Sequence, residues 1–164
     1  MSIDKGNLYL MVGIPGAGKS TYLRERLGPD DVYISRDNIR FHFLKEGEDY
    51  FSHETEVYKE MVRQIKQGLI NGFNVYVDAT HLNQASRNKL KYHIDSSLYE
   101  HIYAIYIKTT LEKAIQQNNN RKGTRSFVPP TAIKRMAGNL IEPTIEEGFD
   151  KIYVVENNKV RIIS

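Results

Sequence analysis

Residues 13–20 read Gly13-Ile14-Pro15-Gly16-Ala17-Gly18-Lys19-Ser20, which matches the phosphate-binding pattern G-x-x-x-x-G-K-[ST] at every fixed position. Small residues let successive backbone N–H groups curl around a phosphate. A lysine at position 19 reaches the β- and γ-phosphates, and a hydroxyl at position 20 can bind Mg²⁺. The alternative interpretation is an ordinary glycine-rich turn between a strand and a helix. The stretch therefore predicts a P-loop, provided that a strand precedes it and a helix follows.

The residues on either side of the motif meet that condition. The apolar run Leu-Tyr-Leu-Met-Val at 8–12 indicates a buried strand, and residues 19–27 can form a helix whose N-terminal dipole points at the anion. We therefore predict that a nucleotide is bound by Gly13, Ile14, Pro15, Gly16, Ala17, Gly18, Lys19, Ser20 and Thr21.

Length and composition limit what the chain can be. With 164 residues, of which 40% are hydrophobic, it is long enough for one core and too short for two domains of usual size, so we expect a single domain over 1–164. The net charge of +3 is compatible with a polyanionic substrate but does not demonstrate one. The absence of cysteine excludes a disulfide framework and a zinc site built from cysteine.

The N-terminal residues contain no basic segment followed by an apolar one, and no run approaches the ~18 to 20 apolar residues of a membrane span. We therefore expect a soluble cytoplasmic protein without a membrane partner. The sequence shows no recognisable dimer seam, so the oligomeric state stays open.

Strand and helix patterns alternate along the rest of the chain. Helical spacing follows residue 36 and recurs over 53–71, through 87–94, over 110–118 and over 131–139. Further strands are predicted at 32–35, 73–78, 102–107 and 151–155, and residues 160–163 can close a terminal hairpin. This alternation predicts an α/β fold, with a parallel sheet of about five strands and helices on both faces. Its binding site should lie at the carboxyl ends of the strands.

Asp37 is the first candidate for handling an acceptor, because it directly follows a predicted strand. A carboxylate there could accept the proton of an attacking hydroxyl. Arg40 lies three residues further on, and in a helix it would share a face with Asp37 and could hold an acceptor phosphate. The alternative is that Asp37 is a helix N-cap and Arg40 its solvated neighbour.

Asp78 closes the predicted strand 73–78, which is the usual position for an acid that helps to hold Mg²⁺ in P-loop proteins. The alternative is a turn residue at a strand end. Thr80 and Asn83 are weaker candidates, and His81 has no second ligand at metal spacing.

The basic segment around Arg121, Lys122 and Arg125 has no apolar periodicity and is closed by two prolines. We predict a mobile lid over approximately 118–130, in which a cation neutralises charge on the transferring phosphoryl group. The alternative is a solvated basic loop.

Several stretches together resemble the P-loop kinases related to the 5′-kinase domain of bacteriophage polynucleotide kinase. They are Gly-Ile-Pro-Gly-Ala-Gly-Lys-Ser-Thr at 13–21, Ser-Arg-Asp-Asn-Ile-Arg at 35–40, Val-Asp-Ala-Thr-His-Leu-Asn at 77–83, Arg-Lys-Gly-Thr-Arg-Ser-Phe-Val-Pro at 121–129 and Glu-Pro-Thr-Ile-Glu-Glu-Gly-Phe-Asp at 142–150. The resemblance implies the P-loop kinase fold, with Asp37 as general base and Arg40 holding the phosphate beside the acceptor hydroxyl. It also implies that Lys19 contacts the phosphates and that Ser20, which we group with Asp78, contacts the metal.

This chain departs from the family pattern at two places. Such lids often begin with arginine, whereas here Asn118 and Asn119 occupy that region, so the acting cation is Arg121, Lys122 or Arg125. The pattern Asp-x-Thr-Asn reads Asp-Ala-Thr-His, with His81 in the last place. No second catalytic motif follows, so we expect no coupled 3′-phosphatase on this chain.

The sequence therefore predicts a kinase that uses ATP, or another nucleoside triphosphate, and Mg²⁺ to phosphorylate a hydroxyl, first of all the 5′-hydroxyl of DNA or RNA. One alternative acceptor class comprises a nucleoside, a nucleotide, a modified DNA base or another small hydroxyl compound. An alternative of another class is a nucleotide-binding ATPase module that acts with a protein partner.

Overall fold

The computed structural model describes residues 4–164 and is built on a six-stranded sheet in the order β2-β3-β1-β4-β5-β6. Neighbouring strands among the first five are parallel, and β6 runs antiparallel to β5. The predicted α/β class is confirmed, and the sixth strand belongs to the expected terminal hairpin. The strands are β1 (Leu8–Val12), β2 (Asp31–Ser35), β3 (Asn74–Asp78), β4 (Ile102–Ile107), β5 (Lys151–Glu156) and β6 (Lys159–Ile163).

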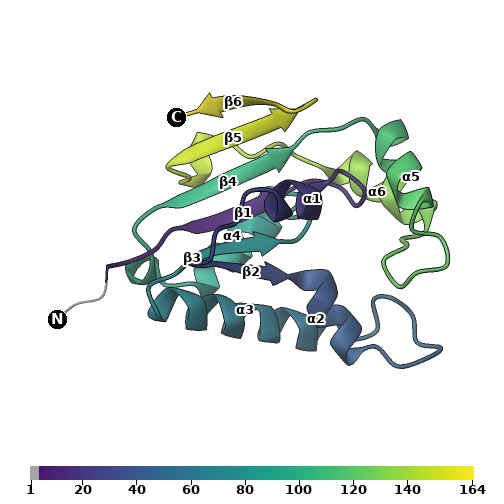
Figure 1. Ribbon diagram of the computed structural model, residues 1–164, viewed down its shortest axis with the longest axis horizontal. Coiled ribbons are helices and arrows are strands. Elements are labelled where there is room, and N and C mark those ends of the chain that lie inside the picture. Colours follow the sequence, from purple (N-terminus) through teal and green to yellow (C-terminus); the bar gives the residue numbers. More distant parts are fainter. Residues whose placement is uncertain (1–3) are drawn as a thin grey trace.

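In the described part of the chain, six α-helices connect and cover these strands (Figure 1). The first ends at Arg24, earlier than the pattern over 19–27 suggested, because the chain turns there toward Gly28 and β2. Two short 3-10 helices lie at Ser96–Leu98 and Ile145–Glu147. The α-helices are α1 (Lys19–Arg24), α2 (Arg36–Phe43), α3 (Glu54–Ile70), α4 (Gln84–His93), α5 (Leu111–Asn119) and α6 (Pro130–Asn139).

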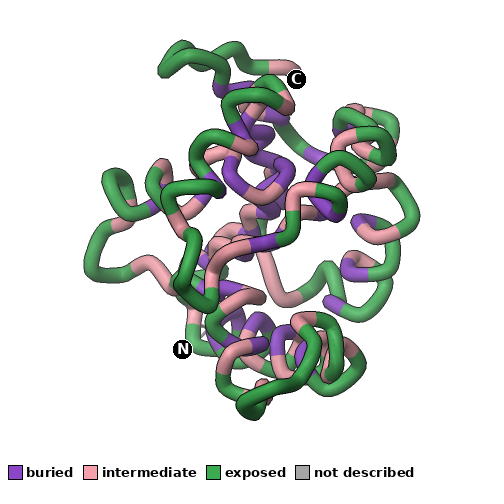
Figure 2. Tube along the Cα trace, turned by 90° about the vertical axis from the view of Figure 1, so that its right-hand side faces the viewer, coloured by how far each residue is buried: buried purple, intermediate pink, exposed green. Residues whose placement is uncertain are grey.

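The central strand β1 is buried because both faces of the sheet are covered. Leu8 and Leu10 belong to a cluster that includes Met61 of α3, whereas Met11 belongs to a second cluster with Leu23 of α1. Figure 2 shows this buried layer running through the middle of the molecule. Burying a leucine side chain contributes about 1.5–3 kcal/mol, so these two layers hold β1 firmly. The loop that follows β1 is thereby fixed at the carboxyl edge of the sheet.

Helix α3 forms because its apolar residues recur at helical spacing. Val57, Met61, Ile65 and Leu69 are buried against the sheet, as the sequence pattern predicted. The helix starts at Glu54, directly after the long loop from α2. The loop turns the chain back, so that the first turn of α3 lies beside α2, at the same edge of the sheet as the P-loop.

None of the helices described over residues 4–164 combines the length and the apolar character needed to cross a membrane.

Candidate active site

The loop between β1 and α1 has the backbone shape that phosphate binding requires. Gly16 and Gly18 have φ values of 86° and 97°, in the left-handed region. A Cβ at Gly16 would lie 2.2 Å from the carbonyl oxygen of Ala114, so only glycine fits there. Gly18 is the N-cap of α1 and brings no side chain, so the first amides of α1 receive no side-chain cap. These N–H groups are suited to an anion.

Lys19 is buried at the mouth of this loop. Its Nζ donates to the carbonyl oxygens of Gly13 at 2.8 Å and Ile14 at 3.0 Å. Burial lowers the pKa of Lys19, and the negative charges of Asp78 and Asp37 partly oppose this effect. The side chain is therefore positioned between the loop and the two predicted acids, where it can exchange a loop carbonyl for a phosphate oxygen.

A pocket of about 260 Å³ lies in front of the loop and brings most of the predicted residues together. Lys122 and Arg125 are not among its lining residues. From the predicted set, it is lined by Pro15, Gly16, Gly18, Lys19, Ser20, Asp37, Arg40, Asp78 and Arg121.

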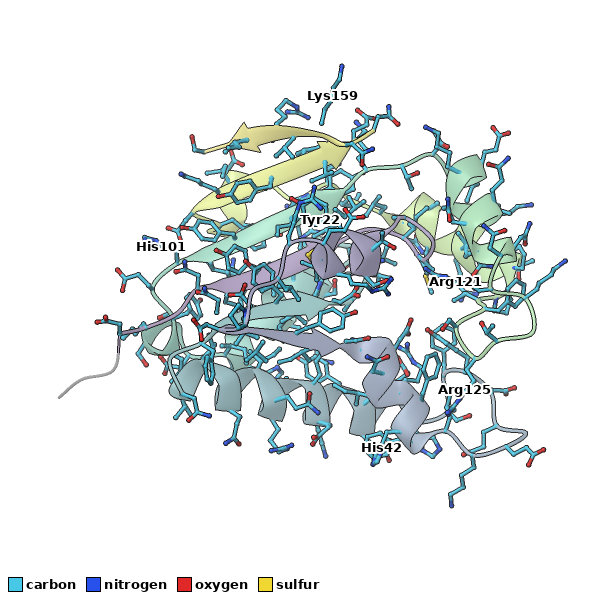
Figure 3. The ribbon with its side chains drawn as sticks, in the orientation of Figure 1. Tyr22, His42, His101, Arg121, Arg125 and Lys159 are labelled. Carbon is cyan, nitrogen blue, oxygen red and sulfur yellow. The ribbon has the colours of Figure 1, made fainter. Side chains whose placement is uncertain are left out.

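A second depression of about 360 Å³ opens beside this pocket. It shares Gly16, Gly18 and Arg121 with the first pocket, and Ala17, Thr21 and Tyr22 also line it. The two depressions meet at Gly16, Gly18 and Arg121, and the second also reaches Tyr22 of α1, which Figure 3 labels.

Asp37 lies in the first turn of α2 but does not cap it. Ser35 is the N-cap, and its Oγ accepts a hydrogen bond from the backbone N–H of Asn38 at 3.1 Å. The N-cap alternative for Asp37 is therefore wrong. Its carboxylate is 41% exposed in the pocket and accepts hydrogen bonds from Arg40 and from the hydroxyl of Tyr50.

Arg40 is buried rather than solvated, and Glu54 holds it. The Nε and Nη2 atoms of Arg40 donate to the two carboxylate oxygens of Glu54 at 2.8 Å and 2.6 Å. Burial acts to raise the pKa of Glu54, but the hydrogen bonds and charge of Arg40, with a contribution from Arg36, outweigh it and hold that pKa below its usual value. A buried guanidinium with a fixed partner is a rigid group on which an anion can be oriented.

Sequence reasoning missed Glu54 and Tyr50, which both line the pocket. An acidic residue in the first turn of a helix is usually explained by the helix dipole, and Tyr50 lies in an irregular loop. The only sequence signal was their position near the start of the long helix. Their role depends on how α3 returns toward α2, which no local pattern encodes.

Asp78 ends β3 at the bottom of the pocket. It accepts a hydrogen bond from the Tyr33 hydroxyl at 2.6 Å. Burial raises the pKa of Asp78, although the charge of Lys19 and the Tyr33 hydrogen bond act in the opposite direction. Ser20 lines the same pocket from α1.

The oxygen ligands of Ser20 and Asp78 suit a hard cation such as Mg²⁺. Within residues 4–164 there is no group of three or more histidine, cysteine or acidic side chains able to hold a metal. The two residues therefore fit a magnesium ion that takes its other ligands from phosphates and water.

The segment between α5 and α6 is the predicted lid, and its basic residues differ in position. Arg121 lines both depressions along the P-loop, and Lys122 is exposed outside them. Arg125 lies toward α2, where it donates a hydrogen bond to the backbone carbonyl oxygen of Phe41 (Figure 3). The Cζ atom of Arg125 lies 5.1 Å from the centre of the Phe41 ring. Among the three candidates, Arg121 alone lines the two depressions along the P-loop.

Asn118 has a structural position instead. It is fully buried, its Nδ2 donates to the carbonyl oxygen of Val128 at 2.6 Å, and its Oδ1 accepts from the Val128 N–H at 3.0 Å. This pair, which we call the Asn118–Val128 clamp, joins the two ends of the lid.

Comparison with known proteins gives a family and a fold. A family model described as an AAA domain matches residues 8–143. No curated protein matches the chain significantly.

Among solved structures, a chain of the Pnkp1/Rnl/Hen1 RNA repair complex superposes with a TM-score of 0.71 and is 25% identical. The match covers 85% of this chain and 45% of that chain, so this chain spans less than half of that relative's length.

Two more distant structures share the fold. A gluconokinase from Sinorhizobium meliloti 1021 matches with a TM-score of 0.58 and 15% identity, over 96% of this chain and 86% of its own. Chaetomium thermophilum Kti12, solved in complex with ADP-AlF3, matches with a TM-score of 0.67 and 16% identity, over 92% and 89%. The fold is that of P-loop kinases.

Proposed function

The chain belongs to the AAA domain family of P-loop proteins, and we propose that it is an ATP- and Mg²⁺-dependent kinase that phosphorylates the 5′-hydroxyl of DNA or RNA. The observation that carries this proposal is the placement of Asp37 and Arg40 in one pocket with the P-loop. A proton acceptor next to a fixed guanidinium, facing a phosphate cradle, suits a hydroxyl that has a phosphate beside it. The likeness to a chain of an RNA repair complex supports the same acceptor class.

The donor triphosphate is held by groups already in place. The amides of the P-loop and the Lys19 ammonium surround the β- and γ-phosphates, and the depression lined by Tyr22 leaves room for the nucleoside. Ser20 and Asp78 would hold Mg²⁺, which would neutralise charge on the phosphate oxygens. Arg121 adds a further cation to this pocket from the segment between α5 and α6.

Asp37 orients the attacking hydroxyl and accepts its proton as the new O–P bond forms and the bond to the β-phosphate oxygen breaks. Its present hydrogen bonds come from Arg40 and Tyr50, and the acceptor hydroxyl would replace that of Tyr50. Arg40 keeps its two bonds to Glu54 and directs Nη1 toward the pocket, where it can meet the acceptor phosphate. In this proposal the P-loop binds the donor triphosphate, and α2 binds and orients the acceptor.

The experiment is transfer of label from γ-labelled ATP to a panel of acceptors, namely 5′-hydroxyl DNA and RNA oligonucleotides, 3′-nucleoside monophosphates, 5′-nucleotides and nucleosides. Label on the oligonucleotide 5′ ends supports the proposal. If label appears only on a mononucleotide or a small acceptor, the phosphoryl-transfer mechanism is supported but the polynucleotide acceptor is rejected. Hydrolysis without any labelled acceptor favours an ATPase module acting with a protein partner.

The residue assignment is tested with Asp37→Asn, and Asp30→Asn on the exposed turn before β2 is the matched control. Asp37→Asn should lower kcat by about 10² to 10⁴ because the proton acceptor is lost, while nucleotide binding is retained. Unchanged turnover in Asp37→Asn would overturn the assignment.

A further inference from the structure

A groove leads away from the candidate active site along α3 and α4. Two depressions of about 270 Å³ and 500 Å³ form it, and both are lined by Arg36, Tyr58 and Lys89. Arg36 also lines the active-site pocket, so the groove and the pocket adjoin at this residue. We call it the Tyr58 groove and define it by Arg36, Tyr58, Lys59, His81, Asn83 and Lys89.

Positive charge collects in this groove, and its two lysines, Lys59 and Lys89, have no carboxylate partner among the described residues. The Nζ of Lys89 lies 4.3 Å from the centre of the Tyr58 ring, and the Cζ of Arg36 lies 5.8 Å from it on the active-site side. Neither Lys89 nor Lys59 forms a salt bridge within the part of the chain that the structure describes. Glu54, the one acid among the lining residues of these two depressions, is already bound to Arg40 and Arg36. Cations gathered around a ring in this way attract a polyanion.

The floor of the groove carries a second, independent signal. Over residues 4–164, two buried side-chain polar atoms have no hydrogen-bond partner, Nε of Arg36 and Nε2 of His81, and both residues line this groove. His81 is only 6% exposed, and its Nδ1 lies 2.5 Å from the carbonyl oxygen of Met11. A carbonyl only accepts hydrogen bonds, so Nδ1 carries the proton and Nε2 is an acceptor. Buried polar atoms are normally paired, and this donor and this acceptor have no partner among the described residues, so a water molecule or a hydroxyl from outside the chain can satisfy them.

We infer that the Tyr58 groove binds the sugar-phosphate backbone of a single-stranded nucleic acid, on the 3′ side of the end that is phosphorylated. This inference rests on the proposed function and narrows its acceptor to a polymer rather than a mononucleotide. With the 5′-hydroxyl at Asp37, the strand continues past Arg36 into the groove, where Lys89 and Lys59 meet its phosphates. The ring of Tyr58 offers an apolar surface to a sugar or a base.

The test measures binding separately from catalysis. Fluorescence anisotropy follows single-stranded 5′-hydroxyl DNA and RNA oligonucleotides, labelled at the 3′ end, over a range of salt concentrations. The proteins compared are the wild type, the double variant Lys59→Ala/Lys89→Ala, and the control Lys159→Ala. Lys159 is exposed on β6, at the opposite edge of the sheet (Figure 3).

In the double variant we expect a Kd raised about tenfold and a salt dependence reduced by about 1.4 in slope, since each neutralised phosphate of a single strand contributes about 0.7. The control should change neither quantity. Phosphorylation of a 3′-nucleoside monophosphate should be unaffected in the double variant, because that acceptor does not reach the groove.

The outcomes separate the two proposals. If the double variant binds oligonucleotides with unchanged affinity and salt slope, the groove assignment is overturned, whatever the kinase assay shows. If the two lysines are required for oligonucleotide binding but no acceptor is phosphorylated, the groove assignment is supported and the proposed kinase function is rejected. Equal affinity for DNA and RNA supports contacts to phosphates alone, and tighter RNA binding supports an added 2′-hydroxyl contact at the groove floor.

Discussion

Glu54 binds Arg40 through both carboxylate oxygens, at 2.8 Å to Nε and 2.6 Å to Nη2, and so leaves only Nη1 to face Asp37. The orientation of a residue on α2 is thereby set by the first residue of α3. Because the Arg40 side chain is 7% exposed, water cannot substitute for the carboxylate. In the proposed kinase, acceptor recognition therefore depends on how these two helices pack.

Glu54→Gln should raise the KM for the acceptor about tenfold while the KM for ATP stays the same, because removing the charge loosens Arg40 and leaves the P-loop intact. Steady-state kinetics with each substrate varied in turn checks this. Glu56→Gln, an exposed change in the same helical turn, is the control. An unchanged acceptor KM in Glu54→Gln would show that Arg40 does not need its partner.

Arg121→Ala should lower kcat by at least about 100-fold, because a lid cation that contacts the transferring phosphoryl group acts mainly in the transition state. Lys122→Ala lies next to it in the same lid but outside the pocket, so kcat should change less than about twofold. Single-turnover assays with saturating ATP make the comparison. Equal losses in both variants would mean that the lid acts through its overall charge and not through Arg121.

Asn118→Ala should lower the free energy of unfolding by about 2–3 kcal/mol, because the N–H and C=O of buried Val128 both lose their partner. Urea denaturation measures the loss. Asn119→Ala changes the exposed neighbour on the same helix and should cost less than about 1 kcal/mol. A similar loss in the two variants would contradict a specific role for the Asn118–Val128 clamp.

Acidification should destabilise the protein in part through His81. Burial lowers its pKa from 6.5 to about 4, even though the Met11 carbonyl favours the charged form. The unfolded chain therefore binds more protons between these values, and the stability that neutral His81 contributes above about pH 6.5 is lost as the pH falls toward about 4. From about pH 7 to about pH 5 this loss is about 2 kcal/mol.

The comparison that isolates this effect is urea denaturation of the wild type and His81→Asn at both pH values. Asparagine tolerates the positive φ of 45° at this position and does not titrate. Other acidic groups titrate alike in both proteins, so the variant should lose about 2 kcal/mol less stability on acidification. Parallel losses would place the pH sensitivity elsewhere.

The features that local sequence patterns encode were predicted well. The strand at 8–12 and the helix beginning at 36 form as predicted, and the strand predicted at 73–78 forms over Asn74–Asp78. Alternation and helical spacing indicate which side of each element is buried. The P-loop also folds as expected, since its glycines are required by positive φ and by the close approach of Ala114.

The rest of the site depends on contacts between distant segments. Glu54 and Tyr50 join the pocket only because α3 returns to α2 after an irregular loop. Which of the three lid cations lines the pocket depends on the backbone path of the lid, and an irregular segment has no sequence periodicity from which that path can be predicted. Asn118 marked a departure from the family pattern, but its partner lies in a different segment, at Val128. Such pairings become visible only in three dimensions.

The Asn118–Val128 clamp also makes the lid a replaceable module. Both ends of residues 119–127 are fastened independently of what lies between them, and closing a longer loop costs only about 0.6 kcal/mol for each doubling of its length. Insertions, deletions and new sequences can therefore accumulate in this segment without disturbing the sheet. Apart from Arg121, to which we assign a role in the proposed reaction, this segment can diverge while the P-loop and the sheet stay unchanged.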